Sequence, residues 1–153
     1  MHQRIEAERF DSVLRILEER FPSLVIEESP WNYDRGVVLA AQPGLDFRIH
    51  VGLDNFDELQ IRVGEFCSEW FPCGEQEQFD RFVLALTGLI SGRNRIVEKR
   101  IFGMYISSNL ESPTASGRWN RLGRHSVLLG FIPWPRTVRI IRNTQGPEYE
   151  SGA

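Results

Sequence analysis

Long apolar runs are absent from this chain of 153 residues, and so are the common sequence signatures of catalysis. The longest strongly apolar stretch, residues 82–90, is about half as long as a membrane span requires. The first residues carry acids and no apolar segment, which argues against a secretory signal and predicts a cytoplasmic protein. Neither a G-x-S-x-G nucleophile motif nor a glycine-rich phosphate loop occurs, so the sequence predicts no catalytic residue.

Cysteine is scarce as well. The only two, Cys67 and Cys73, are too few for a disulfide framework. Zinc sites usually take two pairs of closely spaced ligands, whereas five residues separate this single pair and the three histidines are scattered. We therefore predict no metal and no cofactor. Cys73 precedes a predicted helix, where the pKa of a thiol tends to fall, but both thiols are interpreted as structural.

Lysine occurs once, against 17 arginines, and the charges are unevenly distributed. Residues 1–90 carry 8 basic and 17 acidic side chains, a balance of −9. Residues 91–153 carry 10 basic and 4 acidic side chains, a balance of +6, which gives the net charge of −3. Such asymmetry can mark a surface for a partner of opposite charge. The alternative is that the two halves pair their charges with each other or expose them to water.

Two segments have the apolar spacing of amphipathic helices. The pattern in residues 3–21 ends at Pro22, because proline disfavours helix at the residue before it. Residues 75–91 carry acidic side chains in the early turns, where they suit the helix dipole. Gly92 is placed to cap the C-terminal end of this second helix.

The alternation of apolar and polar residues is clearest in residues 45–51, which are predicted as a half-buried strand. Residues 59–71 follow as the return strand, but the apolar residues before and after Gly64 have opposite parity. We predict a one-residue bulge at Gly64–Glu65, since glycine is the usual residue for a bulge and the slip puts the apolar residues on one face. That core face comprises Leu59, Ile61, Val63, Phe66, Ser68 and Trp70.

The other predicted strands are short. They comprise residues 23–28, 37–42, 95–102, 104–111 and 137–142, with a loop at 112–117, a hairpin around Gly123 within 118–131, and a disordered tail at 143–153. Short turns between strands favour an antiparallel sheet, and with only two helices they predict a single α+β domain over residues 1–142. We expect about seven to nine strands in one sheet, with both helices packed on one face.

Polar side chains share the second face of the predicted hairpin over residues 45–71. They are Arg48, His50, Arg62, Glu65, Cys67 and Glu69. A histidine with two glutamates has the outline of a metal triad or an acid–base site, yet solvated sheet faces commonly look the same. As a partner surface it would be flanked by Trp70 and Phe71, and aromatic residues among charges are typical of binding hot spots. The candidate binding residues are Arg48, His50, Arg62, Glu65, Glu69, Trp70 and, in the proline-braced loop 132–135, Trp134.

Arginine and tryptophan are interleaved between residues 118 and 142. A sheet that exposes both residue types could stack bases and hold phosphates. The sequence pI of about 5.7 and the absence of RNA-binding sequence patterns argue against this function. Single-stranded nucleic-acid binding is therefore the least favoured of three functional hypotheses.

The order of the segments FRIHVG, LQIRVGEFCSEWFP, a helix, further strands and IPWP resembles that of small bacterial proteins of unknown function. Some of these are similar to the single-domain immunity proteins of contact-dependent or polymorphic toxin systems. The resemblance rests on size, acidity and the helix–strand layout over residues 5–142, and it contains no specific motif. It implies binding of a protein partner without catalysis, and it carries over no functional residue.

Two functions are weighed first. One is a non-enzymatic protein-binding domain, of the immunity type, that blocks a basic partner through an acidic surface. The alternative is a small enzyme or ligand carrier with a pocket in a curved sheet near His50 and Glu65, where burial would raise the pKa of the carboxyl group. A homodimer through an exposed edge strand is compatible with either function, and no membrane partner is predicted.

Overall fold

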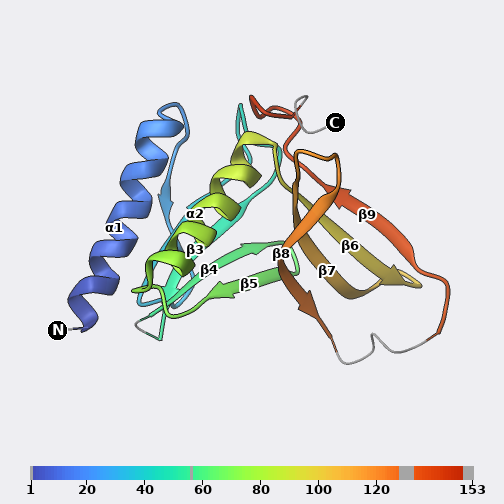
Figure 1. The fold of residues 1–153 in the computed structure, drawn as a ribbon, viewed down its shortest axis with the longest axis horizontal. Coiled ribbons are helices and arrows are strands. Elements are labelled where there is room, and N and C mark those ends of the chain that lie inside the picture. The colour runs from blue at the N-terminus through green and yellow to red at the C-terminus, as the bar shows by residue number, and fades with distance from the viewer. Residues whose placement is uncertain (1, 56, 128–132, 150–153) are drawn as a thin grey trace.

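The structure is a computed structural model that describes residues 2–55, 57–127 and 133–149, and these ranges contain two helices and nine strands (Figure 1). The strands form two antiparallel sheets, with the orders β1-β2-β3-β4-β5 and β8-β7-β6-β9. The first sheet comprises β1 (Glu27–Glu28), β2 (Arg35–Leu39), β3 (Ile49–Asp54), β4 (Glu58–Val63) and β5 (Phe66–Trp70). The second comprises β6 (Arg95–Ile101), β7 (Met104–Pro113), β8 (Trp119–Ser126) and β9 (Thr137–Ile141). The α+β class is confirmed, but the strands expected in one sheet divide into two.

Strand positions differ from the predictions mainly in the first third of the chain. Residues 23–28 contribute only the two residues of β1, and the strand predicted over 45–51 lies at 49–54 as β3. Leu45 instead forms an isolated bridge with Gln42 across the tight turn at Pro43–Gly44. Leu45 is nevertheless fully buried, which accounts for the apolar alternation that extends ahead of the strand.

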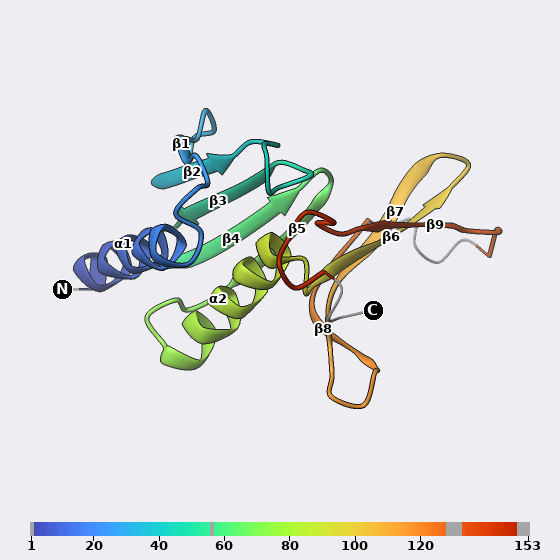
Figure 2. The same cartoon turned by 90° about the horizontal axis from the view of Figure 1, so that it is seen from above.

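The helices α1 (His2–Arg20) and α2 (Gln76–Ser91) agree with the predicted ranges to within one residue at each end. Gly92 has a φ of 81°, the left-handed conformation that favours glycine after a helix. Both helices lie alongside the first sheet, and the second sheet projects on the side away from α1 (Figure 2). One buried apolar cluster joins the helices to β3, β4 and β5, with members that include Phe10, Leu17, Ile49, Phe66 and Phe82. No helix in the described ranges is both long and apolar enough to span a membrane.

A two-residue turn, Gly64–Glu65, divides the segment predicted as one bulged strand. Val63 pairs with Phe66 across it, so residues 59–71 form the antiparallel pair β4 and β5. Gly64 has a φ of 57°, which suits the first central position of a type II′ turn. The predicted bulge is therefore wrong. Glycine is common both in bulges and in tight turns, so its presence did not distinguish the two. The predicted core face is right, since a two-residue turn also leaves the apolar residues of both strands on one side.

The loop between β1 and β2 covers part of the first sheet's outer face, which we define as the face that carries His50, Arg62 and Cys67. Gly36 and Gly52 leave room for this loop. A Cβ atom would lie 2.6 Å from the ring of Tyr33 at Gly36 and 2.7 Å from it at Gly52. The outer face is therefore partly closed by aromatic side chains instead of being fully solvated.

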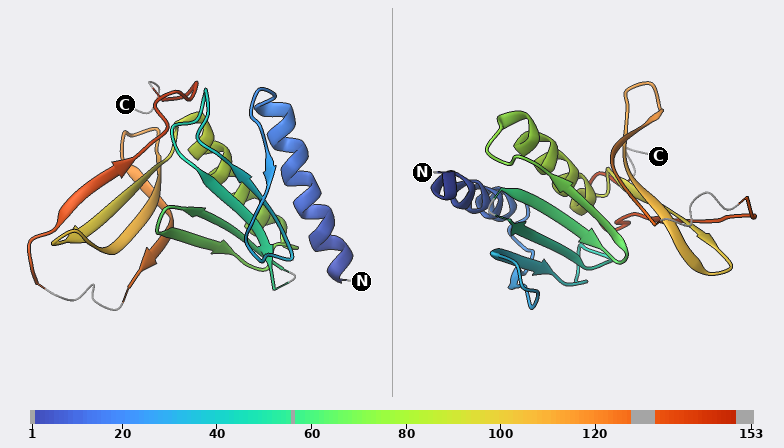
Figure 3. Two further views of the ribbon diagram at one scale, coloured as in Figure 1. Left: turned by 180° about the vertical axis from the view of Figure 1, so that it is seen from behind. Right: turned by 90° about the horizontal axis from the view of Figure 1, so that it is seen from below.

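The two sheets meet at the edge strands β5 and β8, while β6, β7 and β9 extend away from the first sheet (Figure 3). The predicted hairpin around Gly123 is wrong, because β8 continues through this residue and pairs along β7. A register shift at Leu122 interrupts the pairing: Leu110 faces Gly123, and Glu111 faces Arg121. Residues 128–131 of the predicted hairpin lie outside the described residues.

The closing segment, residues 142–149, returns to the first sheet and to α2. Asn143 is fully buried there, and Thr144 donates hydrogen bonds from its backbone and hydroxyl to the carboxylate of Asp46. The disordered tail predicted from residue 143 onward is therefore wrong as far as residue 149. Residues 150–153 of that predicted tail lie outside the described residues.

Candidate functional site

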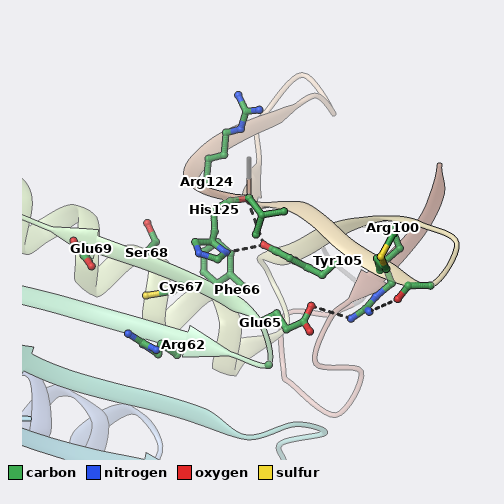
Figure 4. A pocket seen from close by; sticks show the side chains of 14 residues that line it. Arg62, Glu65, Phe66, Cys67, Ser68, Glu69, Arg100, Tyr105, Arg124 and His125 are labelled. Atoms are coloured by element: carbon green, nitrogen blue, oxygen red, sulfur yellow. Dashed lines mark hydrogen bonds and ion pairs between the residues drawn. The ribbon is translucent and has the colours of Figure 1, made fainter. Parts of the chain in front are cut away.

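A groove of about 1020 Å³ lies between the two sheets, along the edge strand β5 (Figure 4). Its lining comes from the end of β4, from most of β5 and the turn before it, from the β6–β7 turn and the residues beside it, and from the end of β8. Side chains that are far apart in the sequence converge here, because β5 and β8 are edge strands of separate sheets. We call this cavity the inter-sheet groove.

Three of the predicted binding residues, Arg62, Glu65 and Glu69, line the inter-sheet groove together with Cys67. Arg62 faces Cys67 across β4 and β5, so strand alternation places both side chains on the outer face. Glu69 lies two residues further along β5 on the same face. Glu65 enters the groove from the turn between the strands. The polar row expected on this hairpin therefore forms one wall of the groove.

Arg100 connects the two walls of the groove. Its guanidinium lies 3.3 Å from the Glu65 carboxylate in the turn between β4 and β5, and 2.5 Å from the Glu98 carboxylate on β6. Glu98 is buried, and an unpaired carboxylate would be costly at such a position. The bond to Glu98 raises the pKa of Arg100, which keeps the guanidinium charged. Glu65 is thereby held against the second sheet.

Tyr105, Ser108 and His125 form a hydrogen-bonded chain on the opposite wall, where Tyr105 and His125 line the groove (Figure 4). The tyrosine oxygen lies 2.5 Å from Oγ of Ser108 and 2.9 Å from Nδ1 of His125. Burial raises the pKa of Tyr105, so its hydroxyl keeps its proton at neutral pH. The hydroxyl can donate to Nδ1 only in the tautomer whose ring N–H is Nε2.

Neither cysteine provides an activated thiolate. Burial raises the pKa of the Cys67 thiol, although the neighbouring Arg62 guanidinium acts in the opposite direction. Burial also raises the pKa of Cys73 to about 11, so its position before α2 does not produce a thiolate. Both residues are free thiols. At neutral pH both are therefore protonated, which disfavours nucleophilic chemistry.

His50 and Arg48 lie outside the inter-sheet groove, in a smaller depression beside Trp31. The imidazole of His50 stacks on Trp31, with 3.8 Å between ring centroids and 7° between ring planes. His50 is only 8% exposed, and burial together with the positive charges of Arg48 and Arg62 lowers its pKa. The imidazole is therefore neutral at pH 7. The expected shared surface of His50 and the two glutamates is divided between two depressions.

Of the two tryptophans predicted as binding residues, one is buried and the other is exposed. Trp70 is a core residue, 4% exposed, and meets the ring of Phe82 edge-on with 5.5 Å between centroids. It is therefore not available as a surface anchor. Trp134 is half exposed, and its ring lies 5.3 Å from that of Phe102 in the turn between β6 and β7. Strand parity places Trp70 on the predicted core face, and the structure confirms that placement over a role as a surface anchor.

The second wall of the groove was not identifiable from the sequence. Its residues include Arg100, Met104, Tyr105, Arg124 and His125. The pairing of β6, β7 and β8 is local, but the contact that forms the groove joins β5 to β8 across the whole of α2. For the β6–β7 part of this wall, the sequence signal was Gly103, which predicts a turn between two strands. It does not predict which part of the molecule that turn contacts.

Within the described residues, no group of three or more His, Cys, Asp or Glu side chains is placed to hold a metal ion. Comparisons with protein-family models, with curated proteins and with solved structures found no match to this chain. The groove offers charges of both signs and hydrogen-bond donors from two sheets, next to the Cys67 thiol, which stays protonated at neutral pH. Such a lining can bind a polar ligand or a polypeptide segment.

Proposed function

We propose that this chain is a non-enzymatic protein-binding domain whose inter-sheet groove holds a segment of its partner. The observation that carries the proposal is a set of exposed apolar side chains at one end of the groove, which we call the apolar rim. Met104 lines the groove and is 50% exposed, and Phe102 beside it is 77% exposed. Trp134 completes the rim through its contact with Phe102. Exposed apolar patches next to charged residues commonly mark binding surfaces.

The charges of the groove suit a partner segment that is itself charged. Glu69 forms no ion pair with any described residue, and Glu65 keeps an exposed carboxylate despite its contact with Arg100. These two carboxylates support the immunity-type role, in which the domain blocks a basic partner. Arg62 lines the same wall, is less exposed than the two glutamates, and would receive an acidic or carbonyl group of the same segment.

The protonation states of the groove support binding over acid–base catalysis. A general base or nucleophile needs a pKa matched to its task. The Cys67 thiol is protonated at neutral pH, and the imidazole of His125 already accepts or donates a hydrogen bond at Nδ1. His50 is neutral but is covered by Trp31. These groups can orient a ligand without reacting with it.

A small-ligand carrier is the second candidate function. Four buried polar atoms on or above the outer face have no hydrogen-bond partner among the described residues: Tyr33 Oη, His50 Nδ1, Gln60 Oε1 and Arg62 Nε. Buried polar groups are normally paired, so such a group of atoms favours a bound polar molecule. The pocket expected around His50 and Glu65 does not enclose both, since Glu65 is exposed and lines the other cavity.

Site-specific photocrosslinking in the source cells tests the protein-binding proposal. A benzoylphenylalanine replaces Met104 in the apolar rim and, as the matched control, replaces Leu84 on the exposed side of α2. We expect a defined partner protein to be crosslinked from position 104 and not from position 84, and the yield to fall when Glu69→Lys is added. Equal yields from both positions, or no crosslink from position 104 at matched protein levels, would contradict the proposal.

Native mass spectrometry of the purified protein separates the two candidates. A bound small molecule that is lost in Arg62→Ala, but kept in Glu69→Lys, would favour the ligand carrier. A spectrum that shows the bare chain mass, together with the crosslink from position 104, would favour the protein-binding domain.

A further inference from the structure

The edge strand β8 carries two exposed arginines on one face of the second sheet. Arg121 and Arg124 are three residues apart, so in a regular strand their side chains would point to opposite faces. The register shift at Leu122 changes this, because Arg121 faces Glu111 and Arg124 faces Asn109 on β7. Those β7 positions are two residues apart and therefore share a face. The two arginines consequently stand side by side, about 7 Å apart along the strand.

This face of the second sheet, which we call the arginine face, is rich in positive charge. The register places Arg95 beside Glu111, and Lys99 beside Ser107, on the same face. Among the residues that β6, β7 and β8 place on this face, the cations are Arg95, Lys99, Arg121 and Arg124, and the one acid is Glu111. The Glu111 carboxylate is bound by Arg95 at 3.0 Å, so it does not compensate the others. Neither Arg121 nor Arg124 forms an ion pair with any residue that the structure describes.

Aromatic and apolar side chains lie among these cations. The guanidinium of Arg95 lies 3.8 Å from the ring centroid of Trp119, and that of Arg142 lies 5.6 Å from it. On the β9 side of the face, Val138 and Ile140 are both more than half exposed. The arginine face thus combines free guanidinium groups with planar and apolar surfaces.

We propose that the arginine face binds a single-stranded nucleic acid, with Arg121 and Arg124 on successive phosphates. Guanidinium groups bind phosphate oxygens through paired hydrogen bonds, and the bases can rest on guanidinium planes and apolar side chains. The chain has a net charge of −3, but this face is positive and therefore complements the negative phosphates of a nucleic acid. An acidic protein would use the cations but would leave the aromatic and apolar surfaces without planar partners. This inference concerns a different face from the proposed partner site, although Arg124 also borders the inter-sheet groove.

Fluorescence anisotropy with a labelled oligothymidylate of about 20 nucleotides tests this inference. Three unpaired cations on the face predict that log K falls with log salt concentration with a slope of about −2. The variant Arg121→Glu/Arg124→Glu should lose at least about tenfold in affinity. The matched control, Arg4→Glu/Arg81→Glu, changes the net charge equally on the two helices and should lose less than about twofold.

The neutral variant Arg121→Gln/Arg124→Gln provides a second, milder test, and thermal unfolding verifies that each variant is folded. We expect it to bind more weakly than the wild type and to flatten the salt dependence. Undetectable binding of the wild type, or equal losses in the β8 and helix variants, would overturn the inference. Equal or tighter binding of a polyglutamate peptide of similar length would assign the face to an acidic protein instead.

Discussion

A Cβ atom on Gly123 would lie 2.6 Å from Oγ of Ser68, so the two sheets meet where β8 has no side chain. A contact this short forces the neighbour to move, and Ser68 belongs to the edge strand that lines the groove. Gly123 has no positive φ, so the requirement is one of space. The separation of the sheets, and with it the width of the inter-sheet groove, depends on this pair.

The variant Gly123→Ala should lower the free energy of unfolding by about 1–3 kcal/mol, because the added methyl group overpacks the contact between the sheets. Urea unfolding followed by circular dichroism measures this loss. Gly74→Ala is the matched control, since the nearest atom to its Cβ would be 4.0 Å away. The double variant Ser68→Gly/Gly123→Ala should recover part of the loss. Equal stabilities of the two single variants would show that the sheets adjust freely at this point.

The closing segment should contribute measurably to stability through Asn143. Its amide nitrogen donates to the carbonyl oxygens of Gly44, at 2.8 Å, and Ile90, and its Oδ1 accepts from the backbone nitrogen of Asp46 at 3.1 Å. Because Asn143 is fully buried, Asn143→Ala leaves backbone groups unpaired at about 1–3 kcal/mol each. We expect a loss of about 2–4 kcal/mol in urea unfolding, against less than about 0.5 kcal/mol for the exposed Asn120→Ala. A small loss at Asn143 would mean that residues 142–149 do not stabilise the fold.

His50 should make the stability dependent on pH. Its pKa in the folded chain lies below that of the unfolded chain, so the unfolded chain takes up the proton first as the pH falls. The stabilisation by neutral His50 is complete above a pH of about 6.5 and is lost as the pH falls through the folded pKa. His50→Phe keeps a ring against Trp31 and cannot be protonated.

The measurement is the free energy of unfolding at about pH 7.5 and about pH 5 for the wild type and for His50→Phe. We expect the wild type to lose more stability over this interval than the variant. If the wild type and His50→Phe lose the same free energy of unfolding over this interval, groups other than His50 cause the pH dependence.

Local features of the fold were predictable because they depend on neighbours in sequence. Both helices follow from apolar spacing and from Pro22 and Gly92, and the first sheet's buried face follows from strand parity. Gly64 and Gly123 were misassigned in opposite ways. Gly64 forms a turn where a bulge is expected, and Gly123 lies within a strand where a turn is expected. A glycine permits all of these conformations, so tertiary contacts decide among them.

The candidate site was predictable only on the side that belongs to one hairpin. Arg62, Glu65 and Glu69 reach the groove as the alternation implies, whereas Arg100 and His125 reach it through the contact between the sheets. His50 is buried because Trp31 folds back over it, and the turn-rich sequence between β1 and β2 contains no signal for that contact. The division of nine strands into two sheets is likewise set by packing beyond any single strand pair.

The ribosome makes Asp46 98 residues before Thr144, its hydrogen-bond partner in the finished protein. The residues of the first sheet and α2 are therefore all synthesised before Thr144 can bind Asp46 beside the turn at Gly44. The entropy cost of closing a loop grows only slowly with its length. The late formation of the contact between Asp46 and Thr144 therefore reflects the order of synthesis more than the length of the loop. The closing segment can therefore join the turn at Gly44 only after the strands of both sheets have been synthesised.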